Sequence, residues 1–256
     1  FPKAHPAKQR LYLDLSTRWN VHTAAHVFAD SYATREAIIK IYHISPAKIT
    51  VAYPGYDSEL SHQNDAVRLS AVKARYGIQG DYILHIGRVQ PRKNLQRLID
   101  AFTELLTHHP QLKLVLAGPM GWLSEPIREH VRQLAMDKVV LFPGYVAQED
   151  KATLISGACV FAYPSLYEGF GFPALEAQAC GTPLLTSTTS SLPEVAGDGA
   201  VLVNPEDDKA IAANLRQLLE DDNLRQNCIT LGYQNLQRFT WNSTAETVLQ
   251  VIEKTL

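Results

Sequence analysis

From residue 82 to residue 203 the sequence alternates short apolar segments with longer amphipathic ones. Short, nearly continuous apolar runs are typical of strands buried on both faces, and the amphipathic stretches between them are typical of helices that cover a sheet. This alternation predicts the α/β class and a doubly wound, Rossmann-like parallel sheet, whose ligands bind at the carboxyl ends of the strands. The predicted strands are 82–86, 112–117, 139–142, 158–163, 183–186 and 200–203, and the predicted helices between them are 93–108, 124–135, 148–156 and 173–179.

The segments on either side of this sheet are also predicted to be regular. Residues 26–31 have the pattern of a short buried strand, and Ser31 is placed to cap a helix at 32–42 before a second strand at 49–52. This βαβ unit predicts a partial second Rossmann-like domain at the N-terminus. The other predicted helices are 65–76, which precedes the sheet, and 209–219, 222–239 and 242–254, which follow it.

Composition and charge narrow the class of protein. The chain has 256 residues, of which 46% are hydrophobic and 20% charged, and this predicts a soluble globular protein with one large domain or one and a half. A formal net charge of −2 and a pI near 6.5 argue against a nucleic-acid partner. Cys159, Cys180 and Cys228 are odd in number and widely spaced, which predicts buried thiols and a reducing, cytoplasmic compartment. No apolar run approaches the ~20 residues that cross a bilayer.

The beginning of the chain is basic. Lys3, Lys8, Arg10 and Arg18 stand against Asp14 alone, in a predicted loop that leads into a helix. One interpretation is a peripheral contact with the inner face of the plasma membrane, or with a lipid-phosphate acceptor, through a basic rim. The other is a solvated helix face, which is the commoner case. Both interpretations stay open.

A glycine-rich turn joins the strand at 158–163 to the helix at 173–179. The turn contains Gly169 and Gly171, and Pro173 is suited to open the helix. Bare N–H groups and the positive end of the helix dipole at such a junction suit a phosphate oxygen. The alternative is a turn that serves packing only, because short glycine-rich motifs are common.

Two glutamates bracket this predicted anion site. Glu168 lies in the loop before the helix, and Glu176 lies about one turn inside it. Carboxylates in these two positions can accept hydrogen bonds from two different polyols. The pattern therefore favours a sugar nucleotide as the ligand, against the alternative of two ordinary surface glutamates.

The stretch EGFGFPALE from Glu168 to Glu176 resembles the E-x7-E donor signature of the retaining family 4 glycosyltransferases, and the resemblance continues through CGTP at 180–183 and LPE at 192–194. It covers roughly residues 24 to 250. These enzymes have the GT-B fold, in which two Rossmann-like domains face each other across a cleft. The resemblance implies that Glu168 orients sugar hydroxyls and Glu176 the ribose. It also implies that the backbone of the Gly169 turn, with Phe170, Gly171 and Phe172, contacts the sugar and the phosphate.

The same resemblance implies a domain division. YPGYD at 53–57 is similar to the NGVD crossover into the second domain, with Tyr53 where Asn is usual. We therefore expect residues 1–56 to be the end of the N-terminal, acceptor-side domain, 57–240 to be the donor-binding domain, and 241–256 to be a closing helix that returns toward the first domain. A whole enzyme of this kind would carry about 150 further residues in front, which would supply the acceptor site.

A basic loop follows the first strand of the donor domain, after Gly87. Arg88 stands at the carboxyl end of that strand and Lys93 at the start of the next helix, so both can reach one site. Two cations there would neutralise the diphosphate as charge develops on it, and the family resemblance assigns Arg88 and Lys93 that role. Arg92 is interpreted as part of a solvated basic turn.

Two further loops follow strands at the same edge of the sheet. Gly118 would allow close approach of the backbone, and the segment around Tyr145 and Val146 resembles the family segment that lies against the nucleobase. The alternative for Tyr145 is ordinary packing after a strand. GPMGW at 118–122 is common in subgroups that act on mannose or related hexoses.

No pattern of metal ligands or nucleophilic triads is present. The nine histidines lack ligand spacing, HExxH and Asp-x-Asp motifs are missing, and His85 is expected in the core. The acidic run at 206–208 is better explained by capping of the next helix. We therefore expect no metal and no cofactor, with Arg88, Lys93 and a helix N-terminus stabilising the leaving group.

The expected function is that of a retaining, metal-independent hexosyltransferase. It would move a hexose from GDP-mannose or a UDP-hexose to a hydroxyl of a glycan or lipid-linked acceptor in polysaccharide or glycoconjugate biosynthesis. In this family attack is usually described as front-face, and none of Glu168, Glu176 or their neighbours is required to be a nucleophile. Two alternatives stay open: another GT-B enzyme, such as a sugar phosphorylase or a nucleotide-sugar epimerase, and a non-catalytic subunit that keeps the fold.

Overall fold

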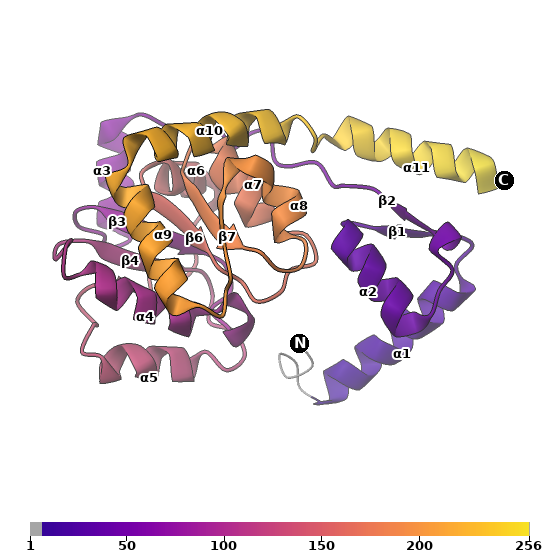
Figure 1. The fold of residues 1–256 in the computed structure, drawn as a ribbon, viewed down its shortest axis with the longest axis horizontal. Helices are drawn as coiled ribbons and strands as arrows, with labels where there is room; N and C mark the ends of the chain where they lie inside the picture. The colour runs from indigo at the N-terminus through magenta and orange to yellow at the C-terminus, as the bar shows by residue number, and fades with distance from the viewer. Residues whose placement is uncertain (1–6, 256) are drawn as a thin grey trace.

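The computed structural model describes residues 7–255, and a six-stranded parallel sheet is its largest element (Figure 1). Every ladder in this sheet is parallel, which confirms the predicted α/β class. The strands, in the order in which they lie side by side, are β5 (Val140–Leu141), β4 (Lys113–Ala117), β3 (Tyr82–Ile86), β6 (Val160–Tyr163), β7 (Leu184–Ser187) and β8 (Val201–Val203).

Helices cover both faces of this sheet. Neighbouring residues of β3 point to opposite faces, so Leu84 packs with one core cluster and Ile83 with the other. The cluster around Leu84 includes residues of α3 (Ala66–Arg75), α6 (Gln148–Ser156), α7 (Phe172–Ala179) and α8 (Leu192–Ala196). The cluster around Ile83 includes residues of α4 (Leu95–Leu105), α5 (Glu125–Gln133) and α9 (Asp208–Glu220), and α10 (Asp222–Leu236) contributes to both.

The strand order reverses direction in the middle of the sheet. From β3 the chain builds outward to β4 and β5, then returns to place β6 on the other side of β3 and continues to β7 and β8. In doubly wound sheets a crevice opens at the carboxyl ends of the two strands where the order reverses. The loops after β3 and β6 therefore lie next to each other, although 70 or more residues separate them in the chain.

A smaller lobe precedes the sheet. It consists of α1 (Ala7–Thr23), β1 (Val27–Ala29), α2 (Tyr32–Tyr42), the 3-10 turn η2 (Pro46–Lys48) and β2 (Ile49–Val51), and β1 pairs with β2 in parallel. We call this part, residues 7–52, the first lobe and the remainder up to residue 240 the main lobe. Ser31 caps α2 by accepting from the Thr34 N–H, as predicted. The predicted basic residue Lys3 lies outside the described residues.

Two chain segments cross between the lobes side by side. The Tyr56 N–H donates to the Phe239 carbonyl over 3.2 Å, and the Thr244 hydroxyl donates to the Tyr53 carbonyl over 2.5 Å. A Cβ atom on Gly55 would lie only 2.5 Å from the Trp241 nitrogen, so the crossing requires glycine there. Beyond it, α11 (Trp241–Thr255) extends toward the first lobe (Figure 1).

Some predicted boundaries differ from the structure. The helix predicted at 93–108 begins only at Leu95 and ends at Leu105, as α4. Lys93 instead ends the 3-10 turn η3 (Pro91–Lys93), because Asn94 adopts a left-handed conformation with φ 60°. The five-residue α8 has no counterpart among the predicted elements; it is too short to show a helical period. The helix predicted to end at 239 ends at Leu236, since Phe239 is buried and its carbonyl is used by the crossing segment.

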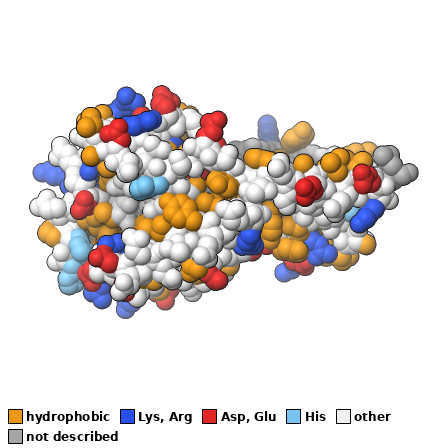
Figure 2. All heavy atoms as spheres, turned by 90° about the horizontal axis from the view of Figure 1, so that it is seen from above, with side chains coloured by type: hydrophobic (Ala, Val, Ile, Leu, Met, Phe, Trp, Pro, Cys, Tyr) orange, Lys and Arg blue, Asp and Glu red, His pale blue; other side chains and the backbone are white. Residues whose placement is uncertain are grey.

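The described cysteines are free, and within residues 7–255 no helix combines the length and the apolar character that a membrane-spanning segment requires. Burial raises the pKa of the Cys180 thiol to about 12 and also raises the pKa of Cys159 and Cys228. On the face shown in Figure 2, acidic and basic side chains are interspersed rather than gathered by sign.

Candidate active site

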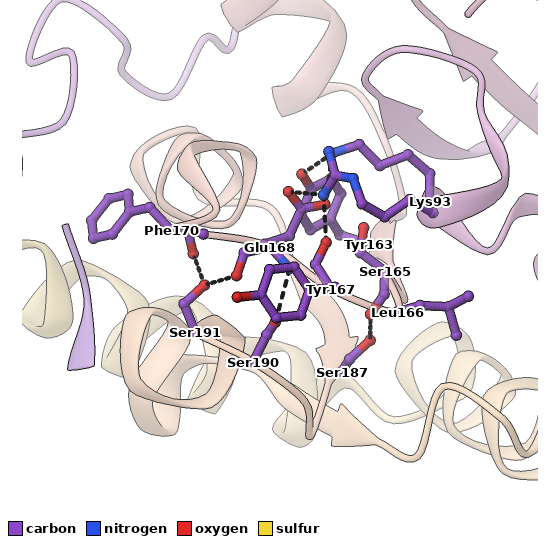
Figure 3. Close-up of polar contacts among 12 residues, drawn as sticks. Lys93, Tyr163, Ser165, Leu166, Tyr167, Glu168, Phe170, Ser187, Ser190 and Ser191 are labelled. Atoms are coloured by element: carbon purple, nitrogen blue, oxygen red, sulfur yellow. Dashed lines mark hydrogen bonds and ion pairs between the residues drawn. The ribbon is translucent and has the colours of Figure 1, made fainter. Parts of the chain in front are cut away.

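Glu168 and Lys93 meet where the carboxyl ends of β3 and β6 adjoin (Figure 3). Lys93 is the last residue of η3, and Glu168 lies in the loop between β6 and α7. The Lys93 Nζ donates to Glu168 Oε1 over 2.7 Å and also to the Tyr163 hydroxyl. Lys93 is 6% exposed and Glu168 is 7% exposed, so the ion pair is buried. The structure thus brings together two of the residues that the sequence assigned to the reaction.

Arg92 pairs with the second oxygen of the same carboxylate. Its Nη1 lies 2.6 Å from Glu168 Oε2 and also donates to the Tyr167 carbonyl. The interpretation of Arg92 as part of a solvated basic turn is therefore wrong, because its side chain lies on the loop after β6. Its place beside Lys93 at the end of a buried strand was the available sequence signal.

These contacts determine the charge of the pair. Burial would raise the pKa of Glu168, but the positive charges of Lys93 and Arg92 outweigh burial and hold that pKa below its ordinary value. Burial lowers the pKa of Lys93, and the Glu168 carboxylate opposes this shift. Burial and the Glu168 charge raise the pKa of Tyr163 well above its ordinary value. At neutral pH Glu168 is therefore a carboxylate that only accepts hydrogen bonds, and Tyr163 keeps its proton.

Arg88 lies apart from this pair. Its side chain is exposed and runs against Gly121, where an added Cβ would come within 2.7 Å of the arginine Cγ. Within residues 7–255, the Arg88 side chain forms neither an ion pair nor a hydrogen bond. Arg88 follows Gly87 just after the carboxyl end of β3. Its positive charge therefore lies at the same edge of the sheet as Lys93 and Glu168.

Glu176 lies inside α7 and pairs with a residue that the sequence did not indicate. The Lys151 Nζ, from α6, donates to Glu176 Oε1 over 2.6 Å. Glu176 Oε2 is buried and has no hydrogen-bond partner among the described residues. Lys151 belongs to no motif in the sequence. Its contact with Glu176 arises from the packing of α6 against α7. The carboxylate therefore has one oxygen held by the protein and one oxygen without a partner.

Serine side chains hold the backbone of the glycine-rich loop (Figure 3). The Glu168 N–H donates to Ser190 Oγ over 2.9 Å. Ser191 Oγ lies within hydrogen-bond distance of two carbonyls, Glu168 at 3.0 Å and Phe170 at 2.5 Å. Both serines lie between β7 and α8 and were not predicted as site residues. Ser190 thus accepts from an N–H of the loop, and Ser191 donates to its carbonyls.

The N–H groups of the same loop are left without acceptors. In the described part of the chain, no hydrogen bond is recorded from the N–H of Gly169, Phe170 or Gly171. Gly171 has φ 115° and precedes the first residue of α7, so the turn places these groups at a helix N-terminus. Unbonded N–H groups at the positive end of a helix dipole are suited to an anion.

Close backbone packing holds the neighbouring loops. The Gly118 N–H donates to the Gly144 carbonyl over 2.7 Å, and the Gly87 N–H donates to the Ala117 carbonyl over 2.9 Å. A Cβ atom on Gly118 would lie 2.1 Å from the Gly87 carbonyl oxygen, and Gly118 has φ 133°. The loops after β3 and β4 therefore approach as closely as only glycine allows, while contact of Gly118 with a donor stays a prediction.

The aromatic and apolar residues of the predicted donor site differ in exposure. Tyr145 is 73% exposed, whereas the neighbouring Val146 is buried. Phe170 is buried against Tyr53 and Phe239, and Phe172 is 41% exposed. Phe170 therefore packs against the segments that cross between the lobes, while Tyr145 and Phe172 present their rings to solvent.

His85 lies in the core beside Lys93. Its Nδ1 is 3.0 Å from the Ala162 carbonyl, and its ring stacks on Tyr163. Burial, and then the Lys93 charge, lower the pKa of His85 to about 4, so the ring is neutral at neutral pH. No three His, Cys, Asp or Glu side chains in residues 7–255 come together in a group that could hold a metal ion.

Comparison with protein families gives one match that covers more than half of the chain. A model described as "Glycosyl transferases group 1" matches residues 73–235. That range contains η3, the glycine-rich loop and both glutamates.

Curated relatives extend the similarity to the rest of the chain. An O-antigen chain mannosyltransferase B of Escherichia coli is 33% identical over 251 residues, which cover 96% of this chain and 65% of the relative. A D-inositol 3-phosphate glycosyltransferase of Kineococcus radiotolerans is 34% identical over 254 residues, which cover 91% of this chain and 58% of the relative. The chain thus spans less than two thirds of the length of either relative.

Solved structures share the fold. A crystal structure of Anabaena HepE in complex with UDP and glucose matches with a TM-score of 0.81 at 21% identity, covering 97% of this chain and 68% of that one. A sucrose-phosphate synthase from Thermosynechococcus elongatus matches with a TM-score of 0.80 at 24% identity, covering 98% and 63%. The parallel sheet and the smaller lobe therefore belong to an arrangement found in GT-B glycosyltransferases.

Proposed function

The chain belongs to the group 1 glycosyl transferases, and on that premise we propose that it binds the donor in the transfer of a hexose from a nucleoside diphosphate sugar to a hydroxyl of a glycan or lipid-linked acceptor. One observation carries this proposal: the buried pair of Lys93 and Glu168 lies in the same loop system as the unbonded N–H groups of residues 169–171. An anion site beside a fixed carboxylate suits a ligand that joins a phosphate to a polyol.

The diphosphate would lie at the N-terminus of α7. The N–H groups of residues 169–171 would donate to its oxygens, and Arg88 and Lys93 would supply positive charge from the loop after β3. Lys93 already faces Glu168, so its charge is held in place before the ligand arrives. As the bond between sugar and phosphate breaks, negative charge grows on the diphosphate, and these donors stabilise the leaving group.

The two glutamates would orient the two polyols of the donor. Glu168 is ionised, and Lys93 and Arg92 hold it in one orientation, so it can accept from hydroxyls of the hexose. Glu176 has Oε2 without a partner and would accept from a ribose hydroxyl. The nucleobase would lie against the backbone at Tyr145 and Val146, with Gly87 and Gly118 allowing close approach of the loops.

The proposed reaction retains configuration at the anomeric carbon. The acceptor oxygen would attack from the face that the diphosphate leaves, and a phosphate oxygen would take the acceptor proton. The carbon–oxygen bond to phosphate breaks while the carbon–oxygen bond to the acceptor forms. Glu168 is not the nucleophile in this proposal, which agrees with both of its oxygens being engaged by Lys93 and Arg92. Arg88 and Lys93 would serve in place of a metal ion.

The donor is proposed to be GDP-mannose or a UDP-hexose. A relative named as a mannosyltransferase supports the first, and a structure of the same fold that holds UDP and glucose supports the second. A glycan or lipid-linked acceptor fits a role in polysaccharide or glycoconjugate biosynthesis.

A peripheral membrane contact through α1 remains a proposal. Leu11, Tyr12, Leu15 and Trp19 of this helix are between 57% and 70% exposed. Basic residues of the same helix, among them Arg10 and Arg18, would approach anionic lipid headgroups.

Calorimetric titration of the chain with UDP, GDP, ADP and their glucose and mannose conjugates tests the proposal. We expect one nucleotide family to bind, and Lys93→Ala and Glu176→Ala each to weaken binding at least tenfold. Lys113→Ala is the matched control, because Lys113 lies at the amino end of β4, at the opposite edge of the sheet. If the two site variants bind the same nucleotide as tightly as Lys113→Ala does, the proposed site is wrong.

A further inference from the structure

A carbonyl of the glycine-rich loop is held by the first lobe. The Gly169 carbonyl accepts from the Ser31 hydroxyl over 2.5 Å and from the Thr34 hydroxyl over 3.0 Å. Ser31 is fully buried and also caps α2. These hydrogen bonds join residues that are 138 and 135 positions apart in the chain. The first lobe therefore contributes hydrogen bonds that hold the loop that carries Glu168.

The main lobe in turn caps the helix that carries Thr34. Glu194, in α8, accepts from the N–H groups of Tyr32 and Ala33, both over 3.1 Å. It also accepts from the Tyr53 hydroxyl over 3.3 Å, and burial followed by the Glu194 charge raises the pKa of Tyr53 to about 12. A carboxylate at the first turn of an eleven-residue helix is favoured by the helix dipole. The contact between the lobes is thus reciprocal.

These contacts have a consequence for the anion site. The C=O of Gly169 and the N–H of Phe170 belong to one peptide plane, and in a trans peptide they point in opposite directions. When Ser31 and Thr34 hold the carbonyl toward the first lobe, the Phe170 N–H must point away from that lobe. Within the main lobe, Ser191 Oγ lies within hydrogen-bond distance of the carbonyls of Glu168 and Phe170, and Ser191 precedes α8 and Glu194. The interlobe hydrogen bonds to the Gly169 carbonyl therefore control the direction of the Phe170 N–H, the central N–H of the three.

We propose that Ser31, Thr34 and Glu194 form an interlobe latch, which orients the Phe170 N–H within the loop of residues 169–171 and so makes binding of a diphosphate depend on the contact between the lobes. The latch residues are positioning residues, because they act through the loop and not on the ligand. The anion-binding part of this inference rests on the proposed function; the orientation of the loop does not.

A purely structural contact would behave differently from a latch. If the interlobe hydrogen bonds only stabilised packing, losing one would change the overall stability without changing the motion of residues 164–172 relative to the rest of the main lobe. A latch couples the two sites, so loosening the first lobe must loosen the loop, and a ligand in the loop must tighten α2 by the same factor.

Thr34→Val is the sharpest variant. Valine matches threonine in shape and has a similar helix propensity, and among residues 7–255 the Thr34 hydroxyl bonds to the Gly169 carbonyl alone. Thr247→Val is the matched control, since in the same part of the chain the Thr247 hydroxyl bonds only to the Ser243 carbonyl of its own helix. Ser31 is less suitable because its loss would also remove the cap of α2.

Hydrogen exchange of the ligand-free chain is the first measurement. We expect Thr34→Val to speed exchange at residues 164–172 about three- to tenfold, as loss of one hydrogen bond implies, while exchange in β3 and β4 stays as in the wild type. Thr247→Val should leave both regions unchanged. Unchanged exchange at residues 164–172 in Thr34→Val would overturn the latch whatever the ligand experiments give.

Titration with UDP and GDP is the second measurement. Thr34→Val should bind the preferred diphosphate about three- to tenfold more weakly than the wild type, and Thr247→Val should bind it equally well. Faster exchange with unchanged affinity would refute the coupling to binding. If the wild type binds neither diphosphate, nor ADP, the proposed function fails, and the exchange result alone then decides whether the latch orients the loop.

The reverse direction gives a third measurement. Saturating diphosphate should slow exchange at residues 32–36 of the wild type, and Glu194→Gln should reduce this effect, because the carboxamide loses the charge that faces the helix N-terminus. Glu36→Gln is the control, because Glu36 lies on α2 but is exposed and pairs with Arg35. Equal protection in Glu194→Gln and Glu36→Gln would contradict the part assigned to Glu194.

Discussion

Lys93 and Glu168 are 75 residues apart in the chain and form a buried ion pair, with 2.7 Å between Nζ and Oε1. Both groups are buried, so neither charge has bulk water as an alternative partner. The stability of the ion pair therefore depends on how well its two groups are positioned. The pair joins the loops after β3 and β6 at the point where the strand order reverses. Stability and donor binding should therefore respond to the same side chains.

Replacement of Glu168 by glutamine should destabilise the fold. The substitution keeps the shape but leaves Lys93 as a buried charge without its counter-ion, and breaking such a pair costs about 3 kcal/mol in the free energy of unfolding. Urea unfolding followed by circular dichroism measures this. Glu104→Gln, an exposed change on α4, should stay within about 0.5 kcal/mol of the wild type. Equal losses in the two variants would contradict the assigned role of the pair.

The contribution of Glu168 should depend on pH. Its folded-state pKa lies below the ordinary value of 4.5, so the stabilisation is present above that value and is lost as pH falls through the folded-state pKa. The stability difference between the wild type and Glu168→Gln should therefore be full at pH 7 and shrink in acid. Urea unfolding of both proteins at pH 7, 5, 4 and 3 tests this. A stability difference that grows in acid would contradict a lowered pKa of Glu168 in the folded state.

Replacement of Lys151 by methionine should weaken donor binding. Lys151 holds Glu176 Oε1, and without it the carboxylate can turn away from the position in which Oε2 is open to a ligand. We expect the affinity for the preferred nucleotide to fall about tenfold or more, as is typical for a lost hydrogen bond to a charged group. Titration calorimetry of Lys151→Met beside Lys151→Arg measures this. Arginine should retain most of the affinity; wild-type affinity in the methionine variant would exclude the positioning role.

Replacement of Gly118 by alanine should damage the loops after β3 and β4. The new Cβ would lie 2.1 Å from the Gly87 carbonyl oxygen, and φ 133° is a conformation that alanine rarely adopts. We expect a loss of about 3 kcal/mol in the free energy of unfolding. Gly77→Ala isolates the backbone effect, because Gly77 has φ 67° and open space around its Cβ position; it should lose only about 1 kcal/mol. Thermal unfolding of both variants measures this. Equal losses of stability in Gly118→Ala and Gly77→Ala would show that the close approach of the two loops is unimportant.

Much of the fold could be predicted because the relevant forces act locally. The strand at 82–86 and the helix at 148–156 were predicted with the bounds that the structure has, since the pattern that indicates each of them lies in neighbouring residues of the chain. The bend at Asn94 and the short α8 were not predicted. A left-handed residue and a five-residue helix depend on what packs around them rather than on a repeating pattern.

The candidate site divides in the same way. From the sequence it follows that Glu168, Glu176 and Lys93 come after strands whose carboxyl ends share one edge, because in a parallel sheet that edge follows from chain direction. The partners of these residues depend on the folded arrangement: Arg92 on Glu168, Lys151 on Glu176, and the Ser31 and Thr34 hydroxyls on the Gly169 carbonyl. These contacts join segments from 25 to 138 residues apart, and such contacts are decided by the order of strands in the sheet and the packing of the two lobes, which no local pattern in the sequence encodes.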